Sequence, residues 1–221
     1  MSNEVKIQEK TETPKVPKAK RHLLSSNKII VSICITAMML ALAVVLDKLT
    51  SFIPFFNMPQ GGHITLSLLP LIIMCLMTGP VYGLIGCFIF GFLNFLIDGG
   101  AVISGWSFLL DYALAFGCIG FTGFFHPLVY SKKNRWVYFV AIILGSLSRY
   151  IWSGLSGAIL FGEYAPEGVN AWFYSFVLYN LPYLGISLIA TAVFIIPLIK
   201  PVELVLNSSN FTSLKPRNLM K

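Results

Sequence analysis

Charged residues are scarce in this sequence: Asp, Glu, Lys and Arg make up 11% of its 221 residues, whereas 56% are hydrophobic. The mean hydropathy is +0.77, which leaves too little polar surface for a water-soluble domain of this length. We therefore expect an integral membrane protein. The formal net charge of +7 does not indicate nucleic-acid binding, because the basic residues gather in the terminal segments and one short loop.

Motifs for catalysis, nucleotide binding and metal binding are also lacking. The sequence holds no G-x-x-x-x-G-K-[ST] phosphate-binding loop, no H-E-x-x-H and no Ser/His/Asp set at a shared depth. Its four cysteines lie in apolar runs without paired spacing and its three histidines are far apart, so neither a disulfide framework nor a metal site is indicated. We expect no catalytic residue and no cofactor in this chain. If ATP drives its activity, another chain must bind the ATP.

Six apolar runs are long enough to be membrane-spanning helices, at residues 28–49, 63–79, 80–97, 106–126, 136–161 and 172–199. They predict an all-α integral membrane protein, a compact six-helix bundle over residues 28–200. Residues 1–27 are rich in Lys, Pro and Thr and lack the apolar core of a signal peptide, so we expect a disordered basic tail. Residues 201–221 are expected to form a second tail.

Lys and Arg concentrate in three segments: before the first span, between the fourth and fifth spans, and after the sixth. Such residues stay on the cytoplasmic side, and six spans place these three segments on one side, so both termini are predicted to be cytoplasmic. The chain is thus expected to be a multi-pass protein of the cell membrane. Its other loops, which should face outward, carry Asp47, Asp98, Glu163 and Glu167.

Asp111 lies among apolar residues in the stretch GWSFLLDYALAFGCIGFTGFF of the fourth span. A charged side chain at the centre of a bilayer costs about 2.5–3.5 kcal/mol on insertion scales, so one that persists usually faces a cavity or a partner. Asp111 is about five residues, or roughly 8 Å, from the outer end of its span. A ligand arriving from outside can reach it.

Other polar and aromatic residues fall at a comparable depth. A stripe with a four-residue repeat follows the fifth span and consists of Arg149, Ser153, Gly157 and Phe161. The first turns of the sixth span carry Tyr174, Ser175, Tyr179, Asn180 and Tyr183. With Asp111, these residues predict an outward-facing pocket for a small, partly aromatic molecule that carries positive charge.

The residues alone leave three structural alternatives open. Asp111 can form a structural ion pair with Arg149, and Asn180 can be an interhelical hydrogen-bonding residue. Trp152 lies beside the stripe in mid-span, where packing and lining of the pocket are equally consistent with its position.

Four motifs resemble the thiamine-specific substrate-binding subunits (S components) of energy-coupling factor (ECF) transporters. They are MPQGGHITLSLLPL after the first span, FLLDYALAFGCIG in the fourth, GSLSRYIWSGLSGAILFGEYAPEG in and after the fifth, and WFYSFVLYN in the sixth. The resemblance spans residues 28–200. It implies a six-helix bundle with a vitamin site near the outer surface, covered by the loop after the first helix. It also implies association with a transmembrane coupling subunit and two ABC-type ATPase subunits that bind the ATP.

Carried over by motif, the resemblance places Asp111 at the thiazolium with Tyr112 as its aromatic neighbour, Asn180 at the pyrimidine, Gly157 in the pocket wall and Phe161 as a stacking ring. Ala37 and Ala41 match the A-x-x-x-A of the first helix, by which these subunits pack on the coupling subunit. The sequence departs from the family in two places. Ser153 replaces the histidine of R-Y-x-x-H, with Trp152 beside it as a substitute surface, and the spacing leaves Tyr174 and Ser175 as alternatives for one ligand-facing position.

These features predict a vitamin-binding membrane subunit that captures thiamine outside and passes it to an ATP-driven module. Ser153 suggests an alternative in the same class, with another vitamin or a thiamine derivative as ligand. A stand-alone secondary transporter is disfavoured because no inverted repeat is detectable. An intramembrane enzyme would need a nucleophile or a metal beside Asp111.

Overall fold

The computed structural model describes residues 18–59, 61–98, 105–132, 134–208 and 214. Within these ranges the chain is helical apart from short connections and one isolated antiparallel bridge between Asn57 and His63. This confirms the all-α class. The predicted tails lie largely outside the described residues, which begin at 18 and, after 208, include only residue 214.

Five helical segments are long and apolar enough to cross a membrane. Two of them are single helices without interruption, α3 (Pro80–Ile97) and α7 (Trp136–Leu160), and α1 (Lys18–Ser51) contains a third. The fourth runs through α4 (Gly105–Ser107), η2 (Phe108–Leu114), α5 (Ala115–Gly117), η3 (Cys118–Phe125) and α6 (His126–Lys132). The fifth comprises α8 (Ala171–Phe173), η5 (Tyr174–Asn180) and α9 (Leu181–Asn207). The connections contain the one-turn helices η1 (Pro54–Phe56) and η4 (Gly162–Tyr164).

The second element of the bundle is shorter than the sequence predicts. α2 (Leu68–Thr78) has 11 residues, all of them buried, instead of the predicted span over residues 63–79. At about 1.5 Å per residue it is roughly 16 Å long, which is only about half the hydrocarbon thickness of a bilayer. Residues 63–67 are not helical because Thr65 and Ser67 engage their hydroxyls and backbone in a local hydrogen-bond network.

The outer limits of the bundle also differ from the prediction. α1 begins at Lys18 instead of residue 28, in a stretch with neither Gly nor Pro. α9 continues to Asn207 through Pro197 and Pro201, so the predicted boundary at residue 200 falls inside a helix. Both changes lengthen elements at the same end of the bundle.

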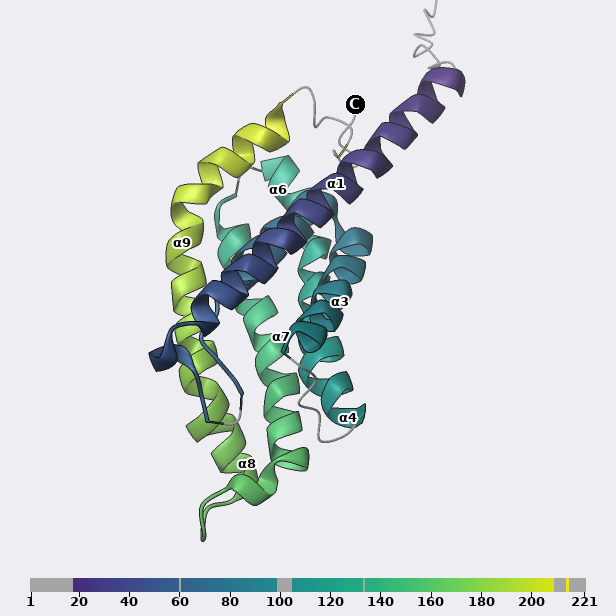
Figure 1. The fold of residues 1–221 in the computed structure, drawn as a ribbon. Coiled ribbons are helices and arrows are strands. Elements are labelled where there is room, and N and C mark those ends of the chain that lie inside the picture. The colour runs from purple at the N-terminus through teal and green to yellow at the C-terminus, as the bar shows by residue number, and fades with distance from the viewer. Residues whose placement is uncertain (1–17, 60, 99–104, 133, 209–213, 215–221) are drawn as a thin grey trace, which may run out of the picture.

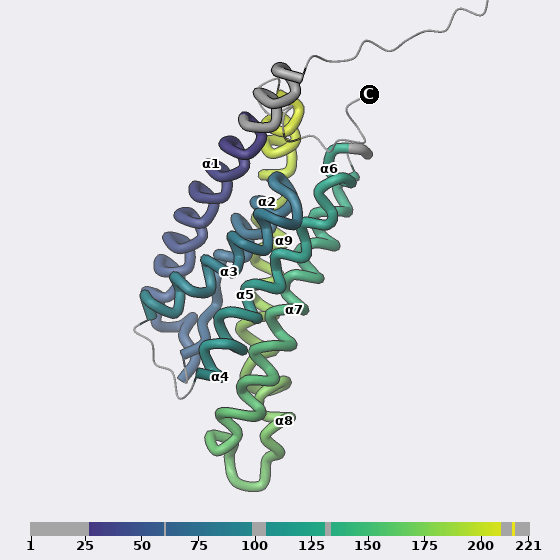
Figure 2. The backbone as a smooth tube through the Cα atoms, turned by 90° about the vertical axis from the view of Figure 1, so that its right-hand side faces the viewer, coloured from purple at the N-terminus to yellow at the C-terminus, as the bar shows by residue number. Residues whose placement is uncertain are grey.

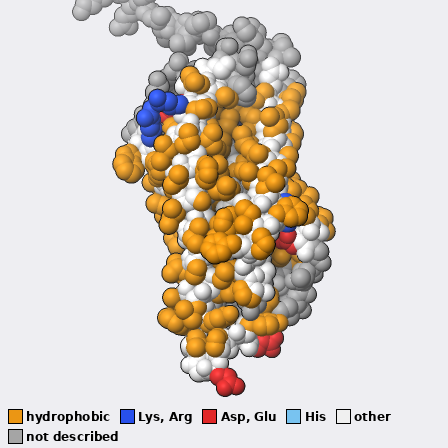
Figure 3. Space-filling view, turned by 60° about the vertical axis from the view of Figure 1, so that its left-hand side comes forward, with side chains coloured by type: hydrophobic (Ala, Val, Ile, Leu, Met, Phe, Trp, Pro, Cys, Tyr) orange, Lys and Arg blue, Asp and Glu red, His pale blue; other side chains and the backbone are white. Residues whose placement is uncertain are grey.

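Figures 1 and 2 show that the start of α1, the end of α9 and α6 lie at one end, and that the connection around α8 lies at the other. In Figure 1, α1 crosses the bundle obliquely. Figure 3 shows a face covered by hydrophobic side chains, with acidic groups at the lower tip. The start of α1 and the end of α9 therefore lie at the same end of the bundle, and the positive charge of the terminal segments predicts that this end is cytoplasmic.

Close backbone contacts hold α3 against the segment that carries Asp111. A Cβ at Gly120 would lie 2.5 Å from the Leu84 Cα, and one at Gly123 would lie 2.7 Å from backbone atoms of residues 79 and 80. Nearer the α8 end, a Cβ at Gly91 would lie 2.3 Å from the Tyr112 carbonyl oxygen. Glycines thus let the two backbones touch, as is typical of helix packing in membranes.

Candidate functional site

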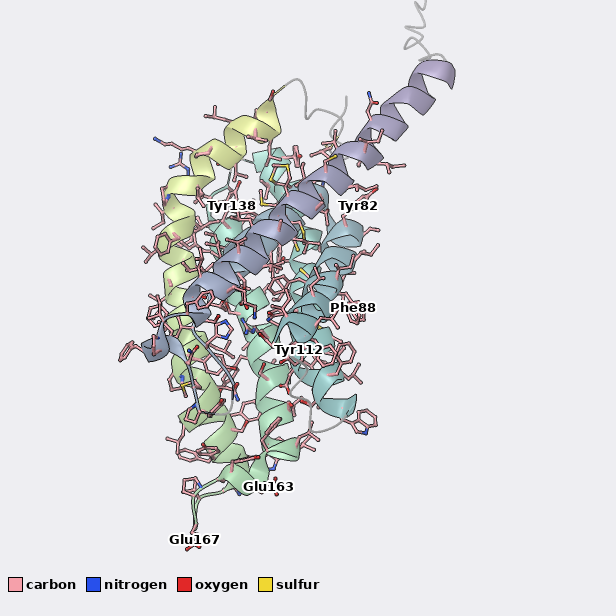
Figure 4. All side chains as sticks on the ribbon, in the orientation of Figure 1. Tyr82, Phe88, Tyr112, Tyr138, Glu163 and Glu167 are labelled. Atoms are coloured by element: carbon pink, nitrogen blue, oxygen red, sulfur yellow. The ribbon has the colours of Figure 1, made fainter. Side chains whose placement is uncertain are left out.

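A cavity of about 400 Å³ lies in the half of the bundle that ends at α8. This volume is in the range of small-molecule sites. Its wall contains eight of the nine predicted ligand contacts: Asp111, Tyr112, Ser153, Gly157, Phe161, Tyr174, Ser175 and Asn180. Figure 4 shows Tyr112 in the middle of the bundle, whereas Glu163 and Glu167 lie at the tip.

Asp111 is held by hydroxyl groups. Its Oδ2 accepts a hydrogen bond of 2.6 Å from Ser156 on α7 and one of 3.1 Å from Ser107 one turn earlier on its own helix. It lies in η2, a π-helical segment, and such wide turns are frequent at functional sites. The carboxylate therefore has a fixed position on the cavity wall.

The alternative of a structural ion pair between Asp111 and Arg149 is not what the structure shows. Both residues line the cavity, but no ion pair joins these two described side chains. Arg149 instead stacks over the Phe116 ring, with its guanidinium carbon 4.5 Å from the ring centroid. The negative charge of Asp111 therefore has no cationic side chain in contact with it among the described residues.

The stripe on α7 faces the cavity along its whole length, as the four-residue repeat predicts. Gly157 has a steric role there, because a Cβ would lie 2.3 Å from the Ser175 Oγ and 3.5 Å from the Asn180 Nδ2. α7 and η5 consequently approach each other closely at this level. Trp152 does not line the cavity, because adjacent helical residues point about 100° apart and its neighbour Ser153 takes the inward direction.

Asn180 is buried and forms hydrogen bonds on both sides of its amide. Its Nδ2 donates to the Ser175 carbonyl oxygen at 2.9 Å, and its Oδ1 accepts from the Tyr183 hydroxyl at 2.8 Å. Both partners belong to the same helical segment as Asn180, and the contact that joins it to another helix is the longer one of 3.4 Å from Nδ2 to the Ser153 carbonyl oxygen on α7. The amide oxygen keeps a second lone pair for a ligand donor. The assignment of nitrogen and oxygen within the amide follows from this network.

Tyr174 and Ser175 both line the cavity but differ in what they contact. The Ser175 hydroxyl donates to the Gly154 carbonyl oxygen at 2.8 Å, and the residue is 2% exposed. Tyr174 is half-buried, and its ring lies 6.2 Å from that of Tyr179. The Ser175 hydroxyl is thus used in packing η5 against α7, and Tyr174 has the larger surface available to a ligand.

The connection between α1 and α2 closes one side of the cavity. The Gly62 N–H donates to the Tyr179 hydroxyl at 3.3 Å, and a Cβ at Gly62 would lie 3.0 Å from the Tyr183 ring. Gly61, with φ of 101°, adopts the left-handed conformation that favours glycine. The loop therefore packs directly on the aromatic side chains of η5 and α9.

Asp47 on α1 holds this connection through contacts with Thr65 and His63. The span pattern predicts Asp47 in an outward loop, but it lies in α1 and is fully buried. Its Oδ1 accepts a hydrogen bond of 2.7 Å from the Thr65 hydroxyl and lies 3.4 Å from the His63 Nε2. Asp98, another acid predicted in an outward loop, caps α3 beside the cavity and forms an ion pair with Lys48.

Several wall residues are not among the predicted ligand contacts. Asn94 on α3 and Asp98, the residue that follows its last turn, are four residues apart and share one face, which is the signal that could have identified them. Phe116 and His63 carry no such signal because their inward direction depends on how the helices pack. Ala37 and Ala41, predicted to contact a partner, are exposed on α1 and lie away from the cavity wall.

Comparison with known proteins gave matches to one group. The family model described as thiamine transporter protein (Thia_YuaJ) matches residues 33–206. "Thiamine transporter ThiT" of Bacillus subtilis (strain 168) is 32% identical over 177 residues, which cover 77% of this chain and 91% of that protein. The protein of the same name from Lacticaseibacillus paracasei is 27% identical over 164 residues, or 70% and 80% of the two chains.

A solved structure of ThiT from Listeria monocytogenes superposes with a TM-score of 0.68 at 25% identity, covering 79% of this chain and 96% of that one. The sequence match and the fold thus agree over most of the helical bundle. This chain belongs to the thiamine transporter protein (Thia_YuaJ) family.

Proposed function

We propose that this protein binds thiamine in the cavity around Asp111 and is the substrate-binding subunit of an ECF-type vitamin importer. Membership of a thiamine transporter family and the five membrane-crossing helices make it a multi-pass membrane protein with a role in transport. Its relatives are named as transporters and not as enzymes. The proposal adds the ligand, the site and the source of energy.

The observation that carries the proposal is the unpaired carboxylate of Asp111 on the cavity wall. The thiazolium ring of thiamine has a permanent positive charge, so it can neutralise this carboxylate without any proton transfer. Inside a bilayer, where an isolated charge is costly, that neutralisation favours a cationic ligand over a neutral one. Tyr112, next to Asp111, offers an aromatic face to the same ring.

The rest of the cavity wall suits the second ring of the same ligand. Phe161 and Tyr174 offer aromatic faces near the mouth, and the Asn180 oxygen can accept a hydrogen bond from an exocyclic amino group. Ser153 contributes a hydroxyl where the resembling family has an imidazole. The aromatic side chains of Tyr179 and Tyr183, which also line the cavity, supply the apolar contact that Ser153 does not.

Energy is proposed to come from other chains. The sequence contains no phosphate-binding loop, so ATP would bind to two ABC-type ATPase subunits. Ala37 and Ala41 are exposed on α1 and four residues apart, which would let a helix of a transmembrane coupling subunit approach closely. This chain needs no cofactor of its own in the proposal.

Isothermal titration calorimetry of the purified protein in detergent tests the ligand, with thiamine, its phosphate esters and an unrelated vitamin compared under one condition. Saturable heat of binding with one site per chain for thiamine supports the proposal, and heat only for the unrelated vitamin refutes it. Co-expression with candidate coupling and ATPase chains, followed by purification through a tag on this chain, tests the assembly. Thiamine uptake into proteoliposomes by this chain alone would refute the need for an energising module.

A further inference from the structure

Asn94 on α3 is a polar residue of the cavity wall that the proposed contacts do not use. It is the one amide in the apolar helix Pro80–Ile97. The residue lines the cavity and is 4% exposed, yet neither end of its amide has a hydrogen-bond partner within the described part of the chain. Buried amides normally have such partners, because unpaired donors and acceptors away from water are costly. Asn94 therefore has unused hydrogen-bonding groups at the cavity.

A molecule in the cavity can reach this amide. Some described polar atoms are both fully enclosed and without a partner, and these include the Arg149 Nε but neither the nitrogen nor the oxygen of the Asn94 side chain. The nitrogen offers two donors and the oxygen two lone pairs. Because the amide is neutral, it suits a neutral group that both donates and accepts a hydrogen bond, such as a hydroxyl.

Asn94 lies close to the level of Asp111, on the neighbouring helix of the wall. One turn before Asn94, a Cβ at Gly91 would lie 2.3 Å from the Tyr112 carbonyl oxygen. The ring of Phe95, the next residue, lies 5.5 Å from the ring of Tyr112. These contacts join α3 to the turn that carries Asp111, and a hydrogen bond from α7 reaches Asp111 itself. The segment η2 therefore lies between α7 and α3.

Three polar groups consequently follow one another around the wall: Asn180 on η5, Asp111 on η2 and Asn94 on α3. The segment η5 is joined to α7 by the contact of 3.4 Å from the Asn180 Nδ2 to the Ser153 carbonyl oxygen. Thiamine has its groups in a matching order: an aminopyrimidine, a cationic thiazolium, and a hydroxyethyl chain on the flank of the thiazolium away from the pyrimidine. With the two rings at Asn180 and Asp111, as proposed, the hydroxyethyl chain points toward α3.

Resting on the proposed function, we infer that Asn94 is a ligand-binding residue whose side-chain amide forms hydrogen bonds with the hydroxyl group of the hydroxyethyl chain. The hydroxyl can donate to the amide oxygen and accept from the amide nitrogen, so both ends of Asn94 gain a partner. The cavity then recognises three parts of the ligand along one wall: an amino-bearing ring, a positive ring and a hydroxyl.

A comparison of two ligands with three proteins tests the inference by calorimetry. The ligands are thiamine and a deoxy analogue in which the hydroxyethyl chain is an ethyl chain, so that both rings are kept. The proteins are the wild type, Asn94→Leu and Asn94→Ala. Tyr82→Phe serves as the matched control, because it removes a hydroxyl from the same helix at a position outside the cavity wall (Figure 4). Melting temperature in detergent shows whether each variant is folded.

We expect Asn94→Leu to weaken thiamine binding by about fivefold or more, because the ligand hydroxyl is then buried without a partner. The deoxy analogue should bind Asn94→Leu within about twofold of the wild type, and it should bind the wild type more weakly than thiamine does. Tyr82→Phe should bind both ligands as the wild type does.

Equal losses for the two ligands in Asn94→Leu, or equal affinity of the wild type for both ligands, would overturn the inference. A wild type that binds thiamine with either of these results leaves the proposed function standing, whereas a wild type that binds neither ligand overturns both. If Asn94→Leu does not fold, Asn94→Ala decides by the same comparison, and the comparison of the two ligands on the wild type needs no variant.

Discussion

Asparagine at position 111 removes a negative charge from the cavity wall and leaves the size of the side chain nearly unchanged. The carboxylate accepts hydrogen bonds from Ser156 and Ser107, and the amide oxygen of Asn can accept the same two bonds. The fold should therefore tolerate Asp111→Asn. What is lost is the attraction between the carboxylate and a positive ring in the cavity.

The size of this loss follows from the surroundings of the carboxylate. Two opposite charges about 4 Å apart attract by roughly 4 kcal/mol at an effective dielectric constant of about 20, and the removal of water from both groups offsets part of this. A net loss of about 2 kcal/mol corresponds to roughly 30-fold weaker binding. We expect a decrease of this size or larger in the affinity of Asp111→Asn for thiamine.

Calorimetry is a better assay for Asp111→Asn than tryptophan fluorescence, because no tryptophan is among the described residues that line the cavity. The matched control is Asp111→Glu, which keeps the charge and should bind more tightly than Asp111→Asn. A neutral aminopyrimidine without the thiazolium should bind the wild type and Asp111→Asn equally weakly. If Asp111→Asn keeps wild-type affinity for thiamine while its melting temperature is unchanged, the charge pairing at the centre of the proposal is wrong.

Three further changes probe the walls and the surface of the bundle. Gly157→Ala places a Cβ 2.3 Å from the Ser175 Oγ, so it should push α7 away from η5. We expect thiamine binding measured by calorimetry to weaken by about tenfold or more. Wild-type affinity would contradict the tight contact. Gly120→Ala places a Cβ 2.5 Å from the Leu84 backbone. Overpacking typically costs about 1–3 kcal/mol, so the melting temperature should fall by several degrees. An unchanged melting temperature would contradict the contact. Ala41→Leu alters only an exposed position on α1, so thiamine affinity should be kept while co-purification with the coupling subunit falls; loss of affinity would show that α1 affects the site.

The amino-acid sequence is sufficient to predict the features that depend on hydrophobic length and helical period. Long apolar runs identify the five membrane-crossing segments, and the four-residue repeat on α7 correctly predicts that Ser153, Gly157 and Phe161 share one wall. Asp111 is identifiable because a carboxylate within an apolar helix has few structural explanations. These signals are local, so each can be read from one segment alone.

The features that the sequence does not reveal depend on packing between segments. The apolar run at 63–79 predicts a full span, yet the polar network around Thr65 and Asp47 delays the start of α2 to Leu68, so that residues 63–67 belong to the connection after α1. A single segment cannot show that its polar residues have partners in another. For the same reason the sequence alone does not identify Phe116 as a wall residue, and it leaves open whether Trp152 also faces the cavity beside Ser153.

The two halves of the bundle differ in what fills them: one contains the polar cavity, and the other is closely packed. The half that ends at α8 has a cavity with charged, amide and phenolic groups, several of them on the π-helical segments η2 and η5, where the wide turns shift side chains out of the regular helical register. The other half is filled by α2, whose residues are all buried, and by glycine contacts that bring backbones together. Rigid packing there fixes where η2 and α7 lie, and this positions Asp111 opposite Ser156. The glycines at 83, 120 and 123 therefore help to position the cavity wall although none of them reaches the cavity.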